Sequence, residues 1–260
     1  NRSAENAIAQ AMFYMQRVNL HYVVDIDIKG FFDNVNHAKL IRQMWSLGIQ
    51  DTKLLKVVRK MLKAPVLMPD GQLVYPDKGT PQGGILSPLL SNIVLNELDW
   101  WISSQWETFP TRHEYHARGD KFDALKRNSK LKEMYIVRYA DDFKIFCRTR
   151  SDAKKIFAAV EKWLKERLHL EISPEKSRIV NLKKQYSDFL GFKLKVNKKA
   201  DRYTVISHIS DKAEKRIENN LIEQIKRIKR ASDEKERHRL IALYNSKVIG
   251  IHNYYDKATH

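Results

Sequence analysis

Cysteine is nearly absent from this sequence, which has only Cys147 in 260 residues. A single thiol cannot form an internal disulfide or a zinc site built from several thiolates. Cys147 lies in an apolar run, so we expect it to pack in the core rather than to take part in chemistry. The nine histidines show no spacing typical of metal ligands, and the chain contains no internal repeat or low-complexity linker.

Long apolar runs are missing as well. No run approaches the roughly 18 residues of a membrane-spanning helix, and the N-terminus lacks the pattern of a signal peptide. Acidic residues are scarce relative to basic ones, because 31 Asp and Glu accompany 48 Lys and Arg for a net charge of +17. We therefore expect an intracellular, cytoplasmic protein that binds a polyanion, with nucleic acid ahead of an anionic membrane.

Two adjacent carboxylates, Asp141 and Asp142, stand between two short apolar runs. The flanking residues 134–137 and 143–147 are rich in aromatic and β-branched side chains, which predicts the two strands of a hairpin. An Asp-Asp pair alone is typical of a polar turn. These flanks are too apolar for a surface ribbon, so we expect a buried hairpin whose charges converge on a ligand.

A second acidic strand is predicted at residues 22–28, where Asp25 and Asp27 lie among apolar residues. Side chains repeat every two residues along a strand, so both carboxylates share one face and periodicity does not choose between them. Carboxylates brought together repel unless a cation lies between them. A few hard oxygen ligands suit magnesium bound jointly with phosphates, and the natural chemistry is phosphoryl transfer with two metal ions.

The other segments give local signals. Periodicity and capping residues predict a helix over 4–16, one capped by Asn36 and stopped by Gly48, and one capped by Asp51 and ended before Pro65. Further helices are predicted from Ser87, from Ser151, from Ser210 and over 238–255. A hairpin is expected around residues 69–71, and residues 103–132 look like a basic, solvated insertion. Residues 79–88, Gly-Thr-Pro-Gln-Gly-Gly-Ile-Leu-Ser-Pro, contain three glycines that let backbone approach a ligand closely.

Basic residues concentrate in residues 176–202, which hold nine Lys or Arg and two Asp. Within them, residues 192–196 alternate strictly between apolar residues and lysines, so a strand places the lysines on one face. A solvated edge strand is the alternative interpretation. The overall charge favours a strand that faces nucleic acid, and the expected contacts are Lys193, Lys195, Lys198 and Lys199.

Five blocks in one order resemble group II intron-encoded reverse transcriptases, also called maturases. The blocks are residues 27–33 (Asp-Ile-Lys-Gly-Phe-Phe-Asp), 79–88, 139–142 (Tyr-Ala-Asp-Asp), 173–177 (Ser-Pro-Glu-Lys-Ser) and 189–192 (Phe-Leu-Gly-Phe). The resemblance covers essentially the whole chain with the family's spacing. It implies an α+β right-hand polymerase with an antiparallel palm sheet, fingers and a partial helical thumb.

The resemblance also implies a division of the chain. Residues 1–209 correspond to fingers and palm, and residues 210–260 to partial thumb helices similar to the family's maturase X region. Arg2-Ser3 resembles the end of an earlier fingers block, so we expect the fingers to be incomplete at the N-terminus. The zinc-dependent endonuclease found at the end of some relatives has no counterpart in this sequence.

The expected metal ligands follow from the same resemblance. It implies that Asp27 and Asp141 bind two Mg²⁺ ions, for which Mn²⁺ is a possible substitute. Asp142 completes the acidic cluster, and Ile28, which follows Asp27, is also counted among the metal-site residues. The family's aromatic residue lies five positions beyond the ligand, and Phe32 fits only Asp27.

Further roles are carried over in the same way. Lys176 resembles a lysine near the departing pyrophosphate, with a solvated lysine as the alternative. Phe32 resembles the aromatic plate beneath the nucleotide sugar, and Gln82 the nucleotide-contacting glutamine, with Gly83 leaving the backbone accessible. Phe189 and Gly191 belong to a segment that holds the primer end in the family. Core packing is the alternative for both aromatic residues.

The resemblance predicts an RNA-directed DNA polymerase. The expected partners are an RNA template (group II intron RNA), a DNA or RNA primer and deoxynucleoside triphosphates, with no membrane partner and with a homodimer possible. Binding of intron RNA would also assist splicing and mobility. The alternative is an RNA-binding splicing cofactor that uses the polymerase core mainly as a scaffold.

Overall fold

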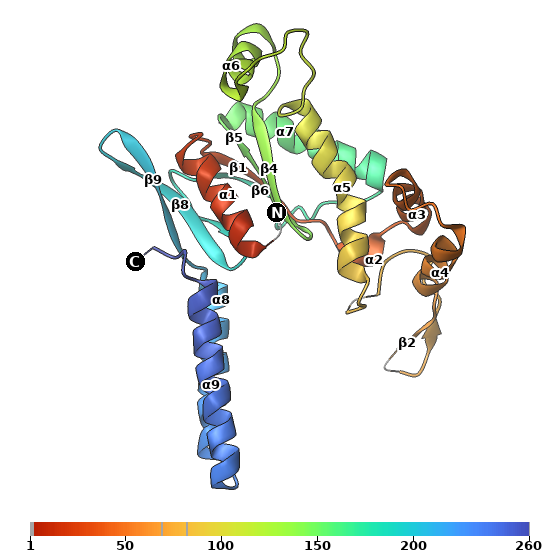
Figure 1. The fold of residues 1–260 in the computed structure, drawn as a ribbon, viewed down its shortest axis with the longest axis vertical. Coiled ribbons are helices and arrows are strands. Elements are labelled where there is room, and N and C mark those ends of the chain that lie inside the picture. The colour runs from red at the N-terminus through yellow and green to blue at the C-terminus, as the bar shows by residue number, and fades with distance from the viewer. Residues whose placement is uncertain (1–2, 69, 82, 260) are drawn as a thin grey trace. The chain divides into compact units, whose positions relative to one another are not determined.

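The computed structural model describes residues 3–68, 70–81 and 83–259. It divides into two compact units, one formed by Asn1–Asn19 with Asn181–His260 and the other by Leu20–Val180 (Figure 1). These units do not follow the expected boundary at residues 209–210, and the division into fingers, palm and thumb stays a prediction.

A four-stranded sheet forms the centre of the Leu20–Val180 unit (Figure 1). Its strand order is β4 (Met134–Tyr139), β5 (Asp142–Cys147), β1 (Tyr22–Ile26) and β6 (Arg178–Asn181). β5 pairs in antiparallel fashion with β4 on one side and with β1 on the other. The apolar runs that flank the two acidic segments therefore become neighbouring strands, and the expected hairpin is confirmed.

The same unit also contains helices. They are α2 (Phe31–Asn34), α3 (His37–Ser46), α4 (Thr52–Leu62), α5 (Ser87–Gln105), α6 (Arg118–Asn128), α7 (Arg150–Trp163) and the π-helix η1 (Leu164–Leu168). Asn36 and Asp51 cap α3 and α4 as expected, since their side chains accept backbone N–H groups of the first turn. α5 packs on β4, while α7 packs on β1 and β5. A two-stranded sheet of β2 (Val66–Leu67) and β3 (Leu73–Val74) follows α4.

Residues 103–132 are mostly exposed or partly exposed, as their composition predicts, but the segment is not irregular. α5 continues to Gln105, α6 lies within the segment, and Trp106 is fully buried. The Trp106 indole N–H donates to the Tyr135 hydroxyl at 3.0 Å, and its ring stacks on Phe122 with 5.6 Å between centroids. Isolated aromatic anchors in a polar stretch produce no periodic signal, which is why the sequence did not indicate the burial of Trp106.

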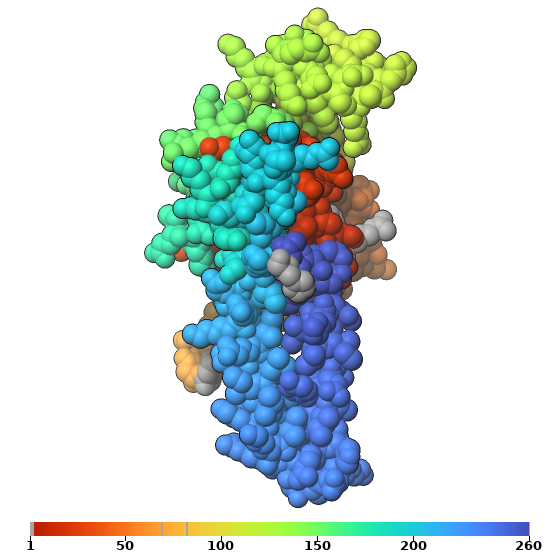
Figure 2. Space-filling model, turned by 90° about the vertical axis from the view of Figure 1, so that its left-hand side faces the viewer, coloured from red at the N-terminus to blue at the C-terminus, as the bar shows by residue number. Residues whose placement is uncertain are grey.

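The unit of the two chain ends combines helices with a three-stranded sheet. Its elements are α1 (Ala4–Gln16), β7 (Ser187–Phe189), β8 (Phe192–Lys199), β9 (Arg202–Ile209), α8 (Asp211–Lys229) and α9 (Glu234–Tyr254). In β8, the side chains of Phe192, Leu194 and Val196 are buried, so the predicted alternation is confirmed. α1 packs on β9, and α8 and α9 lie side by side along their length (Figure 2).

The turn between β7 and β8 needs a glycine. Leu190 and Gly191 have φ of 50° and 82°, the left-handed pair typical of a two-residue hairpin turn. A Cβ at Gly191 would lie 2.7 Å from the Tyr255 hydroxyl. The Tyr254 hydroxyl donates to the Leu190 carbonyl at 2.9 Å. The end of α9 therefore closes over the turn and leaves no room for a side chain.

We expect Gly191→Ala to lower the free energy of unfolding by roughly 2 kcal/mol, because the new Cβ meets both an unfavourable φ and Tyr255. Gly250→Ala is the matched control, since it lies within α9 with nothing within 4 Å of the added Cβ. It should be neutral or stabilising by up to about 1 kcal/mol. Urea unfolding of both variants measures the difference, and equal stabilities would contradict this account of the turn.

Candidate active site

The two acidic strands meet at one end of the four-stranded sheet. The β1–β5 register pairs Asp25 with Lys144 and Ile26 with Phe143. Continued by one residue, this register sets Asp27 beside Asp142. Asp141 lies in the two-residue turn, Ala140-Asp141, that the Tyr139–Asp142 pair closes. The three carboxylates predicted to act together therefore come from the residue that follows β1, the first residue of β5 and the turn that joins β4 to β5.

The turn has an unusual conformation for its sequence. Ala140 precedes Asp141 and has a φ of 55°, in the left-handed region. An alanine there costs about 1–2 kcal/mol relative to the right-handed region, because its Cβ crowds the backbone. Contacts elsewhere in the fold must offset this cost for the turn to persist.

A loop beside β1 brings Lys176 to Asp27. Ile28 bridges to Ile172, the Ser173 N–H donates to the Asp27 carbonyl at 2.8 Å, and the Asp27 N–H donates to the Ser177 hydroxyl at 3.1 Å. The Lys176 Nζ then lies 3.5 Å from Asp27 Oδ2. The Lys176 side chain is 71% exposed, so it has room to reach a substrate. The Ile28 side chain is buried, so only its backbone can contribute to a site.

The structure distinguishes Asp25 from Asp27, which periodicity alone does not. Asp25 Oδ1 lies 2.6 Å from the Nζ of Lys144, whose side chain is only 2% exposed. The Asp25 charge is therefore matched by a buried cation, whereas the Asp27 side chain is 46% exposed and lies 3.5 Å from the ammonium of an exposed lysine, Lys176. Asp27 has the accessible carboxylate, and Asp25 is a structural partner of Lys144.

The acidic cluster fits a hard divalent cation through the chemistry of its donors. Asp27, Asp141 and Asp142 are half-buried and supply carboxylate oxygens, which Mg²⁺ and Mn²⁺ prefer. Among the described side chains, no three His, Cys, Asp or Glu groups already stand close enough together to hold a metal. The assignment of these residues as ligands therefore stays a prediction.

The glycine-containing loop is attached to the segment that carries Phe32. The Thr80 N–H donates to the Phe32 carbonyl at 2.6 Å, and the Gly79 N–H donates to the Val35 carbonyl at 2.7 Å. A Cβ at Gly79, where φ is 92°, would lie 3.0 Å from the Phe32 carbonyl oxygen. Phe31 is buried, whereas Phe32 is half-buried and packs edge-on against it with 5.4 Å between centroids.

His37 is the first residue of α3, and it also contacts the glycine-containing loop, which its sequence position does not predict. Its Nε2 lies 2.6 Å from the Gly79 carbonyl, and its buried Nδ1 has no hydrogen-bond partner among the described residues. This contact joins the start of α3 to the loop across 42 residues of sequence, so no local pattern could have indicated it.

Of the two predicted nucleotide contacts in this loop, Gly83 is exposed. Gln82, the predicted nucleotide contact, lies outside the described residues.

The predicted nucleic-acid contacts all belong to the unit of the two chain ends. Lys198 and Lys199 are exposed at the end of β8. Lys193 is paired with Asp211, and this hydrogen bond raises the pKa of the Lys193 ammonium. Lys195 lies over the Tyr186 ring at 5.4 Å from its centroid. Phe189 is fully buried, and Gly191 lies in the tight turn already described.

Two further expectations concern residues outside this site. Cys147 is buried in β5, where burial raises the pKa of its thiol to about 12, so the expected core role is confirmed. Within residues 3–68, 70–81 and 83–259, every helix is too short or too polar to cross a membrane.

Comparison with known proteins gives a family match over most of the chain. A model described as reverse transcriptase (RNA-dependent DNA polymerase) matches residues 3–194. The group II intron-encoded protein LtrA of Lactococcus lactis subsp. cremoris is 31% identical over 301 residues, covering 92% of this chain and 49% of that protein. Protein YkfC of Escherichia coli (strain K12) is 27% identical over 205 residues, covering 76% and 52%. The chain spans about half the length of both relatives.

Solved structures give a likeness of fold. Apo telomerase from Candida tropicalis, truncated from its C-terminal domain, aligns with a TM-score of 0.52 and 14% identity over 80% of this chain and 39% of that chain. Telomerase from the same organism with a TWJ fragment of telomeric RNA aligns with a TM-score of 0.51 and 13% identity over 98% and 42%. These likenesses confirm the expected α+β polymerase fold.

The different environments of the two β1 carboxylates predict different effects on stability. Asp25→Asn removes the charge that faces buried Lys144, so we expect a loss of roughly 3 kcal/mol in the free energy of unfolding. Asp27→Asn loses only an exposed contact with Lys176 and should change stability by less than about 1 kcal/mol. Urea unfolding without metal measures both, and a larger loss for Asp27→Asn would reverse the assignment.

Proposed function

Because the chain belongs to the reverse transcriptase family, we propose that it is an RNA-directed DNA polymerase that extends a primer on an RNA template. The observation that carries this proposal is the placement of Asp27, Asp141 and Asp142 at the same end of the sheet. A basic nucleic-acid-binding module would explain the charge of +17, but it would need no such cluster.

The acidic cluster is proposed to hold two Mg²⁺ ions, or Mn²⁺ in their place, with Asp27 and Asp141 as the main ligands. When bound, such ions would activate the primer 3′ hydroxyl and stabilise the departing pyrophosphate. Lys176, with its exposed ammonium beside Asp27, would neutralise the negative charge that develops on the leaving group.

The nucleotide is proposed to lie over Phe32. This side chain is half-buried and stands on a short helix that is bonded to the glycine-containing loop. Its bulk would exclude a 2′ hydroxyl and so favour deoxyribonucleotides. Gln82 and Gly83 would contact the same nucleotide, and the exposed lysines at the end of β8 would bind backbone phosphates.

The similarity to an intron-encoded protein supports intron RNA as the template and an added role in splicing and mobility. Such a role implies an intracellular protein whose substrates are deoxynucleoside triphosphates and a DNA or RNA primer. Static light scattering of the purified protein decides between a monomer and the homodimer that the resemblance allows.

We expect Asp141→Asn to lower the rate of primer extension on an RNA template by more than about 100-fold, because loss of a direct ligand should exceed the usual effect of an outer-shell change. The assay uses the protein as its gene encodes it, with Mg²⁺ and with EDTA. Asp123→Asn, an exposed carboxylate on α6, is the control and should keep the parental rate. Extension by Asp141→Asn near that rate would refute the metal assignment.

Phe32→Val should raise the kcat/KM for ribonucleotides relative to deoxyribonucleotides by roughly 10- to 100-fold, because the excluding bulk is removed. Single-nucleotide addition with matched triphosphates measures this ratio. Phe31→Leu is a matched control, because Phe31 is buried and should affect stability rather than sugar choice. An unchanged ratio in an active Phe32→Val enzyme would mean that Phe32 only packs against its neighbours.

A further inference from the structure

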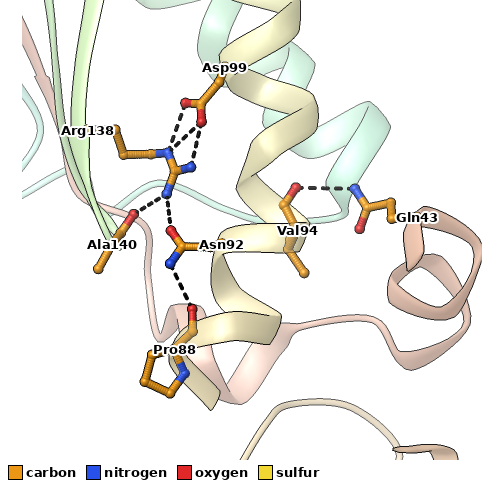
Figure 3. Close-up of polar contacts among 7 residues, drawn as sticks. All are labelled: Gln43, Pro88, Asn92, Val94, Asp99, Arg138 and Ala140. Atoms are coloured by element: carbon orange, nitrogen blue, oxygen red, sulfur yellow. Dashed lines mark hydrogen bonds and ion pairs between the residues drawn. The ribbon is translucent and has the colours of Figure 1, made fainter. Parts of the chain in front are cut away.

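Arg138 is the last but one residue of β4, and its guanidinium makes hydrogen bonds to three residues near the acidic turn (Figure 3). Its Nε lies 2.8 and 3.1 Å from the two Asp99 carboxylate oxygens, and its Nη2 lies 2.5 Å from Oδ2. Its Nη1 donates to Asn92 Oδ1 at 2.9 Å and to the Ala140 carbonyl at 2.7 Å. The Arg138 side chain is only 11% exposed.

The bond to the Ala140 carbonyl acts directly on Asp141. The peptide group that joins Ala140 to Asp141 is planar, so fixing its carbonyl also fixes the positions of the Asp141 nitrogen and Cα. Ala140 is held in the left-handed region, which an alanine does not favour by itself. Arg138 is therefore placed to stabilise the turn with Ala140 in its left-handed conformation.

The other partners of Arg138 both lie on α5, seven residues apart. Asn92 also donates to the Pro88 carbonyl at 3.0 Å, at the end of the glycine-containing loop (Figure 3). α5 is itself tied to α3, because Gln43 donates to the Val94 carbonyl at 3.2 Å and to Glu97 at 2.8 Å. The guanidinium thus connects the acidic turn to the helix that begins at the proposed nucleotide loop.

We propose that Arg138 is a positioning residue for the metal ligand Asp141, and that it couples this ligand to the helix that carries the nucleotide loop. This inference rests on the proposed polymerase function. Arginine suits the task because its planar group presents five donors in fixed directions, enough for Asp99, Asn92 and Ala140 together. A lysine would keep the charge but cannot hold all three acceptors in this geometry.

Arg138→Lys should lower kcat for primer extension by roughly 10- to 100-fold and raise the half-saturating Mg²⁺ concentration, with the KM for the triphosphate changed by less than about twofold. Arg148→Lys is the matched control. Arg148 follows the same hairpin at its other end and pairs with Glu133 at 2.7 Å, so kcat should stay at the parental value. An unchanged kcat in Arg138→Lys overturns the proposal.

A second change separates positioning of the turn from general support of the fold. Glycine adopts the left-handed region freely, so adding Ala140→Gly to Arg138→Lys should restore kcat by about fivefold or more. If Arg138 only held α5 against the sheet, Ala140→Gly would restore nothing and the melting temperature would fall with kcat. That result overturns the proposal.

A measurement without catalysis keeps this inference separate from the proposed function. Mn²⁺ binding to each protein with primer and template is followed by electron paramagnetic resonance. We expect several-fold weaker binding for Arg138→Lys than for the parent and for Arg148→Lys. A parent that binds Mn²⁺ without extending primers would refute the polymerase assignment, while the binding of Arg138→Lys would still decide its positioning role. Equal Mn²⁺ affinities overturn that role.

Discussion

The pairing of β1 with β5 is the interaction on which the candidate site depends. It joins segments separated by more than 100 residues and sets Asp27 beside Asp142 at one end of the sheet. Apolar side chains such as Val24, Phe143 and Ile145 stabilise the pairing from within the core. The energy of burial therefore holds together carboxylates that would otherwise repel, and the repulsion is left for a bound cation to relieve.

Two cationic side chains, Lys144 and Arg138, contact the acidic strand and the acidic turn, and the acidic motif alone does not indicate these contacts. Lys144 matches Asp25 on the same sheet face, and Arg138 holds the turn before Asp141. A buried charge is costly unless it is paired and fully hydrogen-bonded. Each of these cations is paired with a carboxylate, Lys144 with Asp25 and Arg138 with Asp99. Of the four carboxylates at this end of the sheet, Asp25 is paired with a buried lysine, whereas Asp27, Asp141 and Asp142 are partly exposed.

Local sequence signals predicted the elements well and the long-range contacts poorly. The caps at Asn36, Asp51 and Ser210 and the alternation in β8 depend on neighbouring residues, so the sequence contains all the information they need. Trp106, by contrast, is recognised as an anchor only when Tyr135 and Phe122 are beside it. The contacts of His37 and Arg138 were not predicted for the same reason, since their partners come from other segments. The choice of Asp27 over Asp25 needed the family resemblance, and Lys144 supplies its physical reason.

The net charge of +17 is unchanged by ion pairing within the protein. Ion pairs such as Lys144–Asp25, Arg138–Asp99 and Lys193–Asp211 each use one base and one acid. Pairing therefore cannot reduce the excess, because 48 basic residues always exceed 31 acidic ones by 17. A lysine with an acidic partner, such as Lys193, must exchange that partner for a phosphate, whereas the exposed end of β8 offers Lys198 and Lys199 in solvent. Because release of counterions from phosphates drives polyanion binding, the exposed lysines should contribute more affinity than Lys193, although all lie on one strand.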